Sequence, residues 1–276
     1  MSWLVVAKKD FRDAARSKLL WVLTALFVLL VGGLAYVYST TSLGTTPVSG
    51  GSGTIGFVVF LASSASLFVS IVALLVGYKA IAGERESGTM SFLLGLPHAR
   101  WEVVVGKVLG RSAVLGTALL IAFVVAAVLL VALGTAFSAL EYVLFVLLTL
   151  VFAAAFVAIA VALSSVTGES SRAAAVAIGF WLADRIWSTA MLAVLFVVNG
   201  FTLPAPPFPE WYWALSGLGP SAAYSNALAY FLPHDLTRQL HQQVGGLPAW
   251  YGLVVIVLWG AVPLVLGVAR FRRLDL

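Results

Sequence analysis

A cluster of ionisable side chains stands between two long apolar stretches, in the segment GERESGTMSFLLGLPHARWEVVVGK at residues 83–107. Its two carboxylates, Glu84 and Glu86, flank Arg85, and a close pair of acids is one arrangement that general acid–base catalysis uses. The same residues could form a docking surface for a partner, or the solvated ends of two helices. The elements around the segment must decide between these three interpretations.

Other residues with chemical potential offer little for catalysis or metal binding. The histidines His98, His234 and His241 are scattered, and the seven-residue spacing of the last two, beside Asp235, is more typical of a solvated surface than of a metal site. Residues 105–107 lack the upstream glycine and the following Ser or Thr of a phosphate-binding loop. The chain has no cysteine, which excludes thiolate ligands and Cys nucleophiles. We therefore predict no catalytic residue, no metal and no cofactor in this chain.

Asp184 and Arg185 form a second ionisable pair, in the middle of an apolar stretch. Isolated charges at the centre of a membrane helix cost about 2.5–3.5 kcal/mol each or more. Adjacent helical residues point about 100° apart, so we expect the two not to face each other squarely, and each to find a partner on another helix, in a polar cavity or in a second copy. Two roles stay open: lining or gating a translocation route, or locking helices together as a structural ion pair.

The composition indicates that a membrane surrounds these charges. The chain of 276 residues is 62% hydrophobic and 10% charged, whereas a soluble domain is about 45–50% apolar and about 25% charged. A spanning helix needs about 20 mostly apolar residues, and six stretches qualify, none with the alternation of barrel strands. We predict an all-α integral membrane protein with spans at residues 19–38, 57–78, 112–134, 142–163, 174–198 and 250–269.

The positive charges predict the orientation of these spans. All 16 Lys and Arg residues except Arg185 and Arg238 lie in the N-terminal stretch, the 2–3 and 4–5 connections with their flanks, or the C-terminus. Segments rich in Lys and Arg face the cytoplasm, so we expect a multi-pass protein of the cytoplasmic membrane with both termini inside. We also expect residues 19–38 to be a retained span, because the stretch is too long for a signal peptide and no cleavage site follows it.

Three segments lie outside the predicted spans. Residues 1–18 carry cations opposite an apolar face and are predicted to form an interfacial helix; an ordinary basic flank that sets the topology is the alternative. The uncharged 39–56 connection is typical of a flexible outer loop. The outer 199–249 connection is rich in Pro, Trp and Tyr, and its part at 220–231 is predicted to form a short re-entrant or surface helix. The apolar positions of the interfacial helix are Leu4, Ala7, Phe11, Ala14 and Ala15.

The charged segment, within residues 83–101, then has an expected shape. Residues 84–86 extend the second span into water, Gly88 permits a break, and Thr89 caps a short helix. Pro97 ends this helix, and Arg100 begins the helix of the third span. A short apolar helix flanked by charges suits docking to a cytoplasmic partner. Its apolar patch is made of Met90, Phe92, Leu93, Leu94 and Leu96.

The segment resembles the region after the second span of ABC-2-type permeases, the membrane subunits of one class of ABC transporter. Ser91 stands where an acidic residue is common, and His98-Ala99 replaces an apolar–Ser pair. The resemblance extends over residues 1–276, which would form one transmembrane domain. The chain is similar to bacterial and archaeal single-chain permeases, including the type that matures nitrous oxide reductase. The residues that match are Glu84, Arg85, Glu86, Gly88, Thr89, Leu93, Leu94, Pro97, Arg100, Gly106 and Lys107.

The resemblance implies a transport subunit without catalysis of its own. Two copies would pair as a homodimer among membrane lipid, and two ABC ATPase subunits would bind below and supply ATP and Mg; no nucleic acid is implied. Residues 88–97 would be the coupling helix, and transport would be export. Lipids, drugs, peptides, polysaccharides and a sulfur species all suit this fold as cargo. The expected docking residues are Glu84, Arg85, Glu86, Gly88, Thr89, Phe92, Leu93, Leu94, Pro97 and Arg100.

Two other functions stay open on the sequence. A membrane anchor or assembly factor could recruit an ATPase without moving a solute, and a flux assay would separate it from a transporter. An intramembrane enzyme could use Asp184 or the loop histidines, and it would be active when the chain is purified alone.

Overall fold

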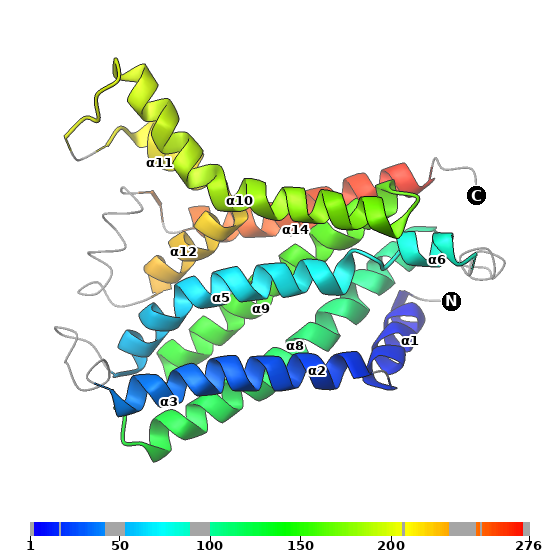
Figure 1. Ribbon diagram of the computed structural model, residues 1–276, viewed down its shortest axis with the longest axis horizontal. Helices are drawn as coiled ribbons and strands as arrows, with labels where there is room; N and C mark the ends of the chain where they lie inside the picture. The colour runs from blue at the N-terminus through cyan, green and yellow to red at the C-terminus, as the bar shows by residue number, and fades with distance from the viewer. Residues whose placement is uncertain are drawn as a thin grey trace.

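The structure, a computed structural model, describes residues 3–16, 18–41, 53–88, 100–205, 208–231, 247–248 and 250–272. Within these ranges the chain forms helices and turns and no strand, which confirms the predicted all-α class (Figure 1). The helices are α1 (Trp3–Arg16), α2 (Lys18–Phe27), the π-helical η1 (Val28–Gly32), α3 (Gly33–Thr40), α5 (Gly53–Gly77), α6 (Ala82–Glu86), α8 (Arg100–Ala132), α9 (Ala139–Val166), α10 (Ser170–Val198), α11 (Glu210–Ser216), α12 (Pro220–Phe231) and α14 (Tyr251–Arg272).

Six helical stretches in the described part of the chain are long and apolar enough to cross a membrane, as predicted for an integral membrane protein. The first of them joins α2, η1 and α3 into one continuous stretch beside α8. The six stretches are Lys18–Thr40, Ser64–Glu86, Trp101–Ala132, Ala139–Val166, Ser170–Val198 and Trp250–Phe271.

Helix α9 is the centre of the bundle, with α5, α8 and α14 packed around it. Its Ala-rich stretch, residues 153–162, lets neighbouring helices approach closely. Gly77 of α5 lies so near α9 that an added Cβ would stand 2.5 Å from the Cβ of Ala160. Small residues let helix backbones come together and gain dispersion contacts where no water can drive association.

The chain termini and α6 lie at the same end of the bundle, which we call the terminal end (Figure 1). An even number of long stretches brings the chain back to the side from which it started.

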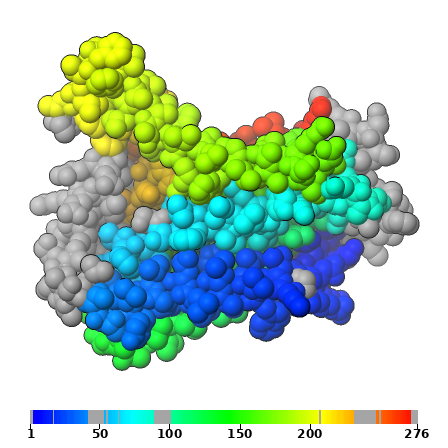
Figure 2. Space-filling model, in the orientation of Figure 1, coloured from blue at the N-terminus to red at the C-terminus, as the bar shows by residue number. Residues whose placement is uncertain are grey.

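Helix α10 is the most exposed of the long helices, because only 11% of its most apolar 18-residue stretch is buried. It crosses one face of the molecule, and its later half projects from the body together with α11 (Figures 1 and 2). The predicted helix at residues 220–231 is confirmed as α12, and it packs into the bundle. Its buried Tyr224 lies with its hydroxyl 2.8 Å from that of Thr149 and its ring stacked 4.5 Å from Phe152, both on α9.

Candidate functional site: an ionic cluster at the terminal end

The charged residues at 84–86 stand at the end of the second long stretch, Ser64–Glu86, on a separate short helix, α6. The expectation of one continuous helix is wrong, because α5 ends at Gly77 and a turn at residues 78–81 intervenes. The side chain of Ser164 on α9 stabilises this break. Its hydroxyl oxygen accepts hydrogen bonds from the backbone N–H groups of Ile81 (3.1 Å) and Ala82 (2.9 Å). These are amides that the start of a helix leaves without an intrahelical partner.

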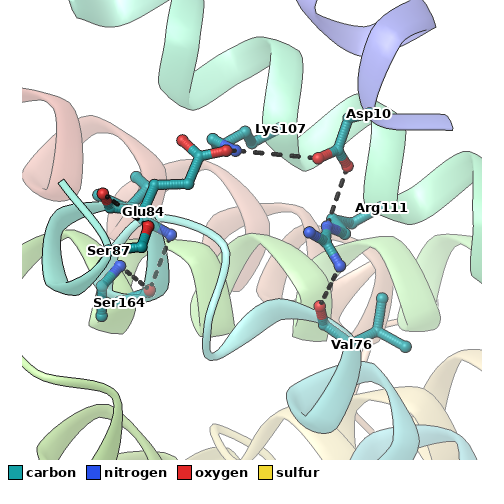
Figure 3. Close-up of polar contacts among 9 residues, drawn as sticks. Asp10, Val76, Glu84, Ser87, Lys107, Arg111 and Ser164 are labelled. Atoms are coloured by element: carbon teal, nitrogen blue, oxygen red, sulfur yellow. Dashed lines mark hydrogen bonds and ion pairs between the residues drawn. The ribbon is translucent and has the colours of Figure 1, made fainter. Parts of the chain in front are cut away.

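Four charged side chains from three helices meet beside this break (Figure 3). Lys107 of α8 is buried, and its Nζ lies 2.6 Å from Oε1 of Glu84 on α6 and 3.8 Å from Oδ1 of Asp10 on α1. Arg111, one turn further along α8, places its Nε 2.9 Å from Oδ2 of Asp10. It also donates from Nη1 to the backbone oxygen of Val76 at the end of α5, at 3.3 Å. We call Asp10, Glu84, Lys107 and Arg111 the ionic cluster.

The other two charges of α6 bind the start of α10. Arg85 donates from Nη1 to the backbone oxygen of Thr167, in the turn between α9 and α10, at 3.3 Å. Glu86 accepts a hydrogen bond at Oε2 from the backbone N–H of Ser170, the first residue of α10, at 3.1 Å. A carboxylate at a helix N-terminus is favoured by the helix dipole. Three consecutive charged residues therefore hold three different parts of the structure, whereas we expected them to extend freely into water.

Two glycines on α8 let α1 lie directly against it. An added Cβ on Gly106 would stand 2.6 Å from the Cβ of Val6, and one on Gly110 would stand 2.8 Å from the Cβ of Asp10. Lys107 and Arg111 each follow one of these glycines, so the close approach also brings their cations to Asp10. The helix itself is confirmed, and Leu4, on its predicted apolar face, is 57% exposed. The face that packs on α8 contains Asp10 because its carboxylate finds cations there.

Burial raises the pKa of the Asp10 carboxyl above its ordinary value, and this is the largest influence on it. The cations of Arg111 and Lys107 lower the pKa, while the carboxylate of Glu84 raises it. Desolvation therefore outweighs the two ion pairs, as is common where charges are removed from water.

The structure describes part of the predicted docking segment. Gly88 has φ of 73°, which favours glycine, so the predicted break is confirmed at this residue. Arg100 begins α8, as expected. The other predicted docking residues, Thr89, Phe92, Leu93, Leu94 and Pro97, lie outside the described residues, and so do the three histidines.

Asp184 and Arg185 pair with each other, so the expectation that they do not face each other is wrong. Nη2 of Arg185 lies 2.8 Å from Oδ2 of Asp184, because the long arginine side chain folds back along the helix. Each also has a partner on another helix, as expected. Ser221 at the start of α12 donates to Asp184 from its N–H (3.1 Å) and hydroxyl (2.5 Å), and Arg185 donates to the hydroxyl of Ser66 on α5 (3.2 Å). These contacts join α10 to α12 and α5.

Sequence reasoning missed Asp10 and Ser164, and it noticed Gly106 and Lys107 without giving them a role. A signal for the first helix was present in the spacing of Gly106 and Gly110, which is a small-xxx-small pattern for close helix packing. Asp10 was also detectable as an acid within a run of cations. Nothing in the sequence singles out Ser164, because its partners are backbone amides.

The raised pKa of Asp10 gives a test with a definite sign. The folded chain binds this proton more readily than the unfolded chain, so the contribution of Asp10 to stability is full at acid pH and is lost as the pH rises through the folded pKa. We expect the stability advantage of the wild type over Asp10→Asn to grow as the pH falls from neutral toward about 4, the ordinary pKa of an aspartate. The thermal unfolding midpoint of the purified chain measures it.

The same substitution at an exposed position of α1, Asp13→Asn, is the control for removing a carboxylate from this helix. An advantage of the wild type that shrinks as the pH falls would contradict the assignment. It would mean that the ion pairs with Arg111 and Lys107, rather than burial, dominate at Asp10.

Comparisons with known proteins agree with this architecture. Residues 4–276 match the ABC-2 family transporter protein family. The chain is 30% identical over 284 residues to the probable ABC transporter permease protein NosY of Stutzerimonas stutzeri, covering 97% of both chains. It is 33% identical over 210 residues to the protein of the same name from Pseudomonas aeruginosa, covering 72% of this chain and 73% of that one. The chain therefore belongs to the ABC-2 family of transporter proteins, as a multi-pass membrane permease subunit whose family implies an ABC ATPase partner.

Proposed function

We propose that this permease exports a solute across the cytoplasmic membrane as a homodimer, with one ATPase docked on the terminal end of each copy. ATP and Mg act in the ATPase, and the chain itself makes and breaks no covalent bond. The docked segment lies within residues 83–101 and follows directly on α6.

The ionic cluster is the observation that carries this proposal. The docking segment begins two residues after Glu86. Glu84 ties α6 to Lys107 of α8, which in turn pairs with Asp10 of α1, while Ser164 ties α6 to α9 and Glu86 ties it to α10. A push on the docking segment would therefore move α6 together with the ends of four helices. Rigid-body motion of packed helices around a shared contact is one way in which a transporter changes the side that is open.

The distribution of positive charge supports the orientation. The terminal end carries α1, α6, the start of α8 and the end of α14, which between them hold most of the Lys and Arg residues. Placing this end in the cytoplasm satisfies the positive-inside rule and puts the docking segment where ATP is available.

Co-purification of the chain with its partner ABC ATPase tests the docking. We expect Leu93→Asp to weaken the complex about tenfold or more in Kd, since a carboxylate in an apolar cleft of the partner is desolvated. The matched control is Leu140→Asp, the same change at a residue that is 72% exposed near the opposite end. Full retention of the ATPase by Leu93→Asp would contradict the docking assignment.

The exposed face of α10 supports the homodimer. Ile178, Leu182 and Ile186 recur every four residues and are 58%, 49% and 57% exposed. The chain has no cysteine, so Leu182→Cys introduces a single thiol. We expect this variant to form a disulfide-linked dimer on oxidation in membranes, whereas Val124→Cys on the exposed side of α8 should stay monomeric. Equal crosslinking of both would contradict dimerisation through α10.

A further inference from the structure

An apolar groove of about 750 Å³ lies between α10 and α14, with α9 as its floor. Its α14 wall is a stripe that recurs every three or four residues from Val255 to Gly267, and its α10 wall includes Phe180, Ala183 and Trp187. This volume is within the range of about 300–1,000 Å³ that is usual for ligand sites. Both walls belong to stretches long enough to cross a membrane, so the groove opens toward lipid.

The polar groups at the groove are already engaged within the protein. Trp187 donates from Nε1 to the backbone oxygen of Leu215 (2.8 Å), and Trp259 donates from Nε1 to that of Leu218 (2.7 Å). The Asp184 carboxylate, which also lines the groove, accepts hydrogen bonds from Ser221 and forms an ion pair with Arg185. The groove therefore offers hydrocarbon and the flat faces of two indole rings, which suit an alkyl chain rather than a polar ligand.

The groove is about as long as one leaflet of a bilayer is thick, and it runs along the helix axes. The twelve helical steps from Val255 to Gly267 rise about 18 Å, and half of a hydrocarbon core is about 15 Å thick. The groove runs along the helix axes, from Asp184 near the middle of α10 to Val166 and Leu266 toward the terminal end. A lipid acyl chain has this length and this direction.

A cation stands where the headgroup of such a lipid would lie. Arg270 is exposed and follows Leu266 by four residues, so it continues the same face of α14 one turn beyond the apolar stripe. Basic side chains at this depth attract anionic lipid. We infer that the groove holds one acyl chain of a resident anionic membrane phospholipid, with its phosphate near Arg270. This site goes beyond the proposed function, since it requires neither ATP nor cargo.

Photolabelling of the full chain in bilayer nanodiscs tests the inference. The discs contain phosphatidylcholine and a small share of phosphatidylglycerol with a photoactivatable diazirine on its acyl chain, and labelled residues are mapped by mass spectrometry. We expect residues 255–267 and 180–187 to carry more label than Val124, Val128 and Val131, which are exposed on α8 and report general lipid contact.

Two variants fill the groove from opposite walls, Ala183→Trp on α10 and Leu258→Trp on α14. Both should abolish the excess label, whereas Ala175→Trp, an exposed alanine of α10 outside the lining, should retain it. Arg270→Gln should leave chain labelling in place and remove the preference for phosphatidylglycerol over a phosphatidylcholine that carries the same diazirine chain.

Three results would overturn the inference. Label on the groove equal to that on α8 would mean general lipid contact. Absence of label from the groove would mean that a second copy or another protein covers it. Excess label that survives both tryptophan variants would place the lipid elsewhere. Because the assay contains no ATP and no ATPase, none of these results bears on docking or transport.

Discussion

The buried cation of Lys107 is the constraint on which the terminal end depends. Its side chain is 3% exposed and lies between Glu84 and Asp10. A charge removed from water to this extent must be paired, and removing one partner of a buried pair typically costs about 3–5 kcal/mol. The helices that carry the two carboxylates are thereby held to α8, although they are short or lie at the edge of the bundle.

The position of α6 follows from this pairing and from the contacts around it. A helix of five residues cannot be stable alone. It is held in place because Ser164 accepts its first amides, Lys107 binds Glu84, and Ser170 donates to Glu86. The break between α5 and α6 is therefore built into the fold, and it gives the charged segment a direction different from that of the span before it. If residues 88–97 dock an ATPase, as we propose, α6 is the element that stands between the docking segment and the membrane helices.

The second ionic site, Asp184 and Arg185, also joins helices through paired charged side chains, but it lies near the middle of α10. Its carboxylate receives Ser221 at the start of α12, and its guanidinium donates to Ser66 on α5. Helix α10 has little buried surface of its own, so these polar contacts fix its middle against the bundle. The later half of α10 projects together with α11, to which it is joined by the hydrogen bond from Trp187 to the backbone oxygen of Leu215.

The sequence was sufficient to predict the long helices, because each needs a long apolar stretch that no soluble fold would carry. It also predicted α12 and the break at Gly88, where local residue types decide the backbone. It failed where one residue must be paired with another far along the chain. The bridge from Lys107 to Glu84 and Asp10, and the hydroxyl of Ser164 under α6, both depend on how helices pack. Periodicity alone does not specify that packing.

Reversing the buried pair tests the central claim most directly. The measurement is the rate of ATP hydrolysis by the co-purified complex for Glu84→Lys, Lys107→Glu and the double variant, all in an Asp10→Asn background. In the wild type, Oδ1 of Asp10 lies 3.8 Å from Nζ of Lys107. The Asp10→Asn background therefore removes a carboxylate that would repel a glutamate at position 107. If the Glu84–Lys107 pair joins the docking segment to the membrane helices, each single reversal slows hydrolysis and the double reversal restores most of the rate, because the opposite charges meet again. A double variant as slow as the slower single variant, or single variants with unchanged rates, would contradict the account.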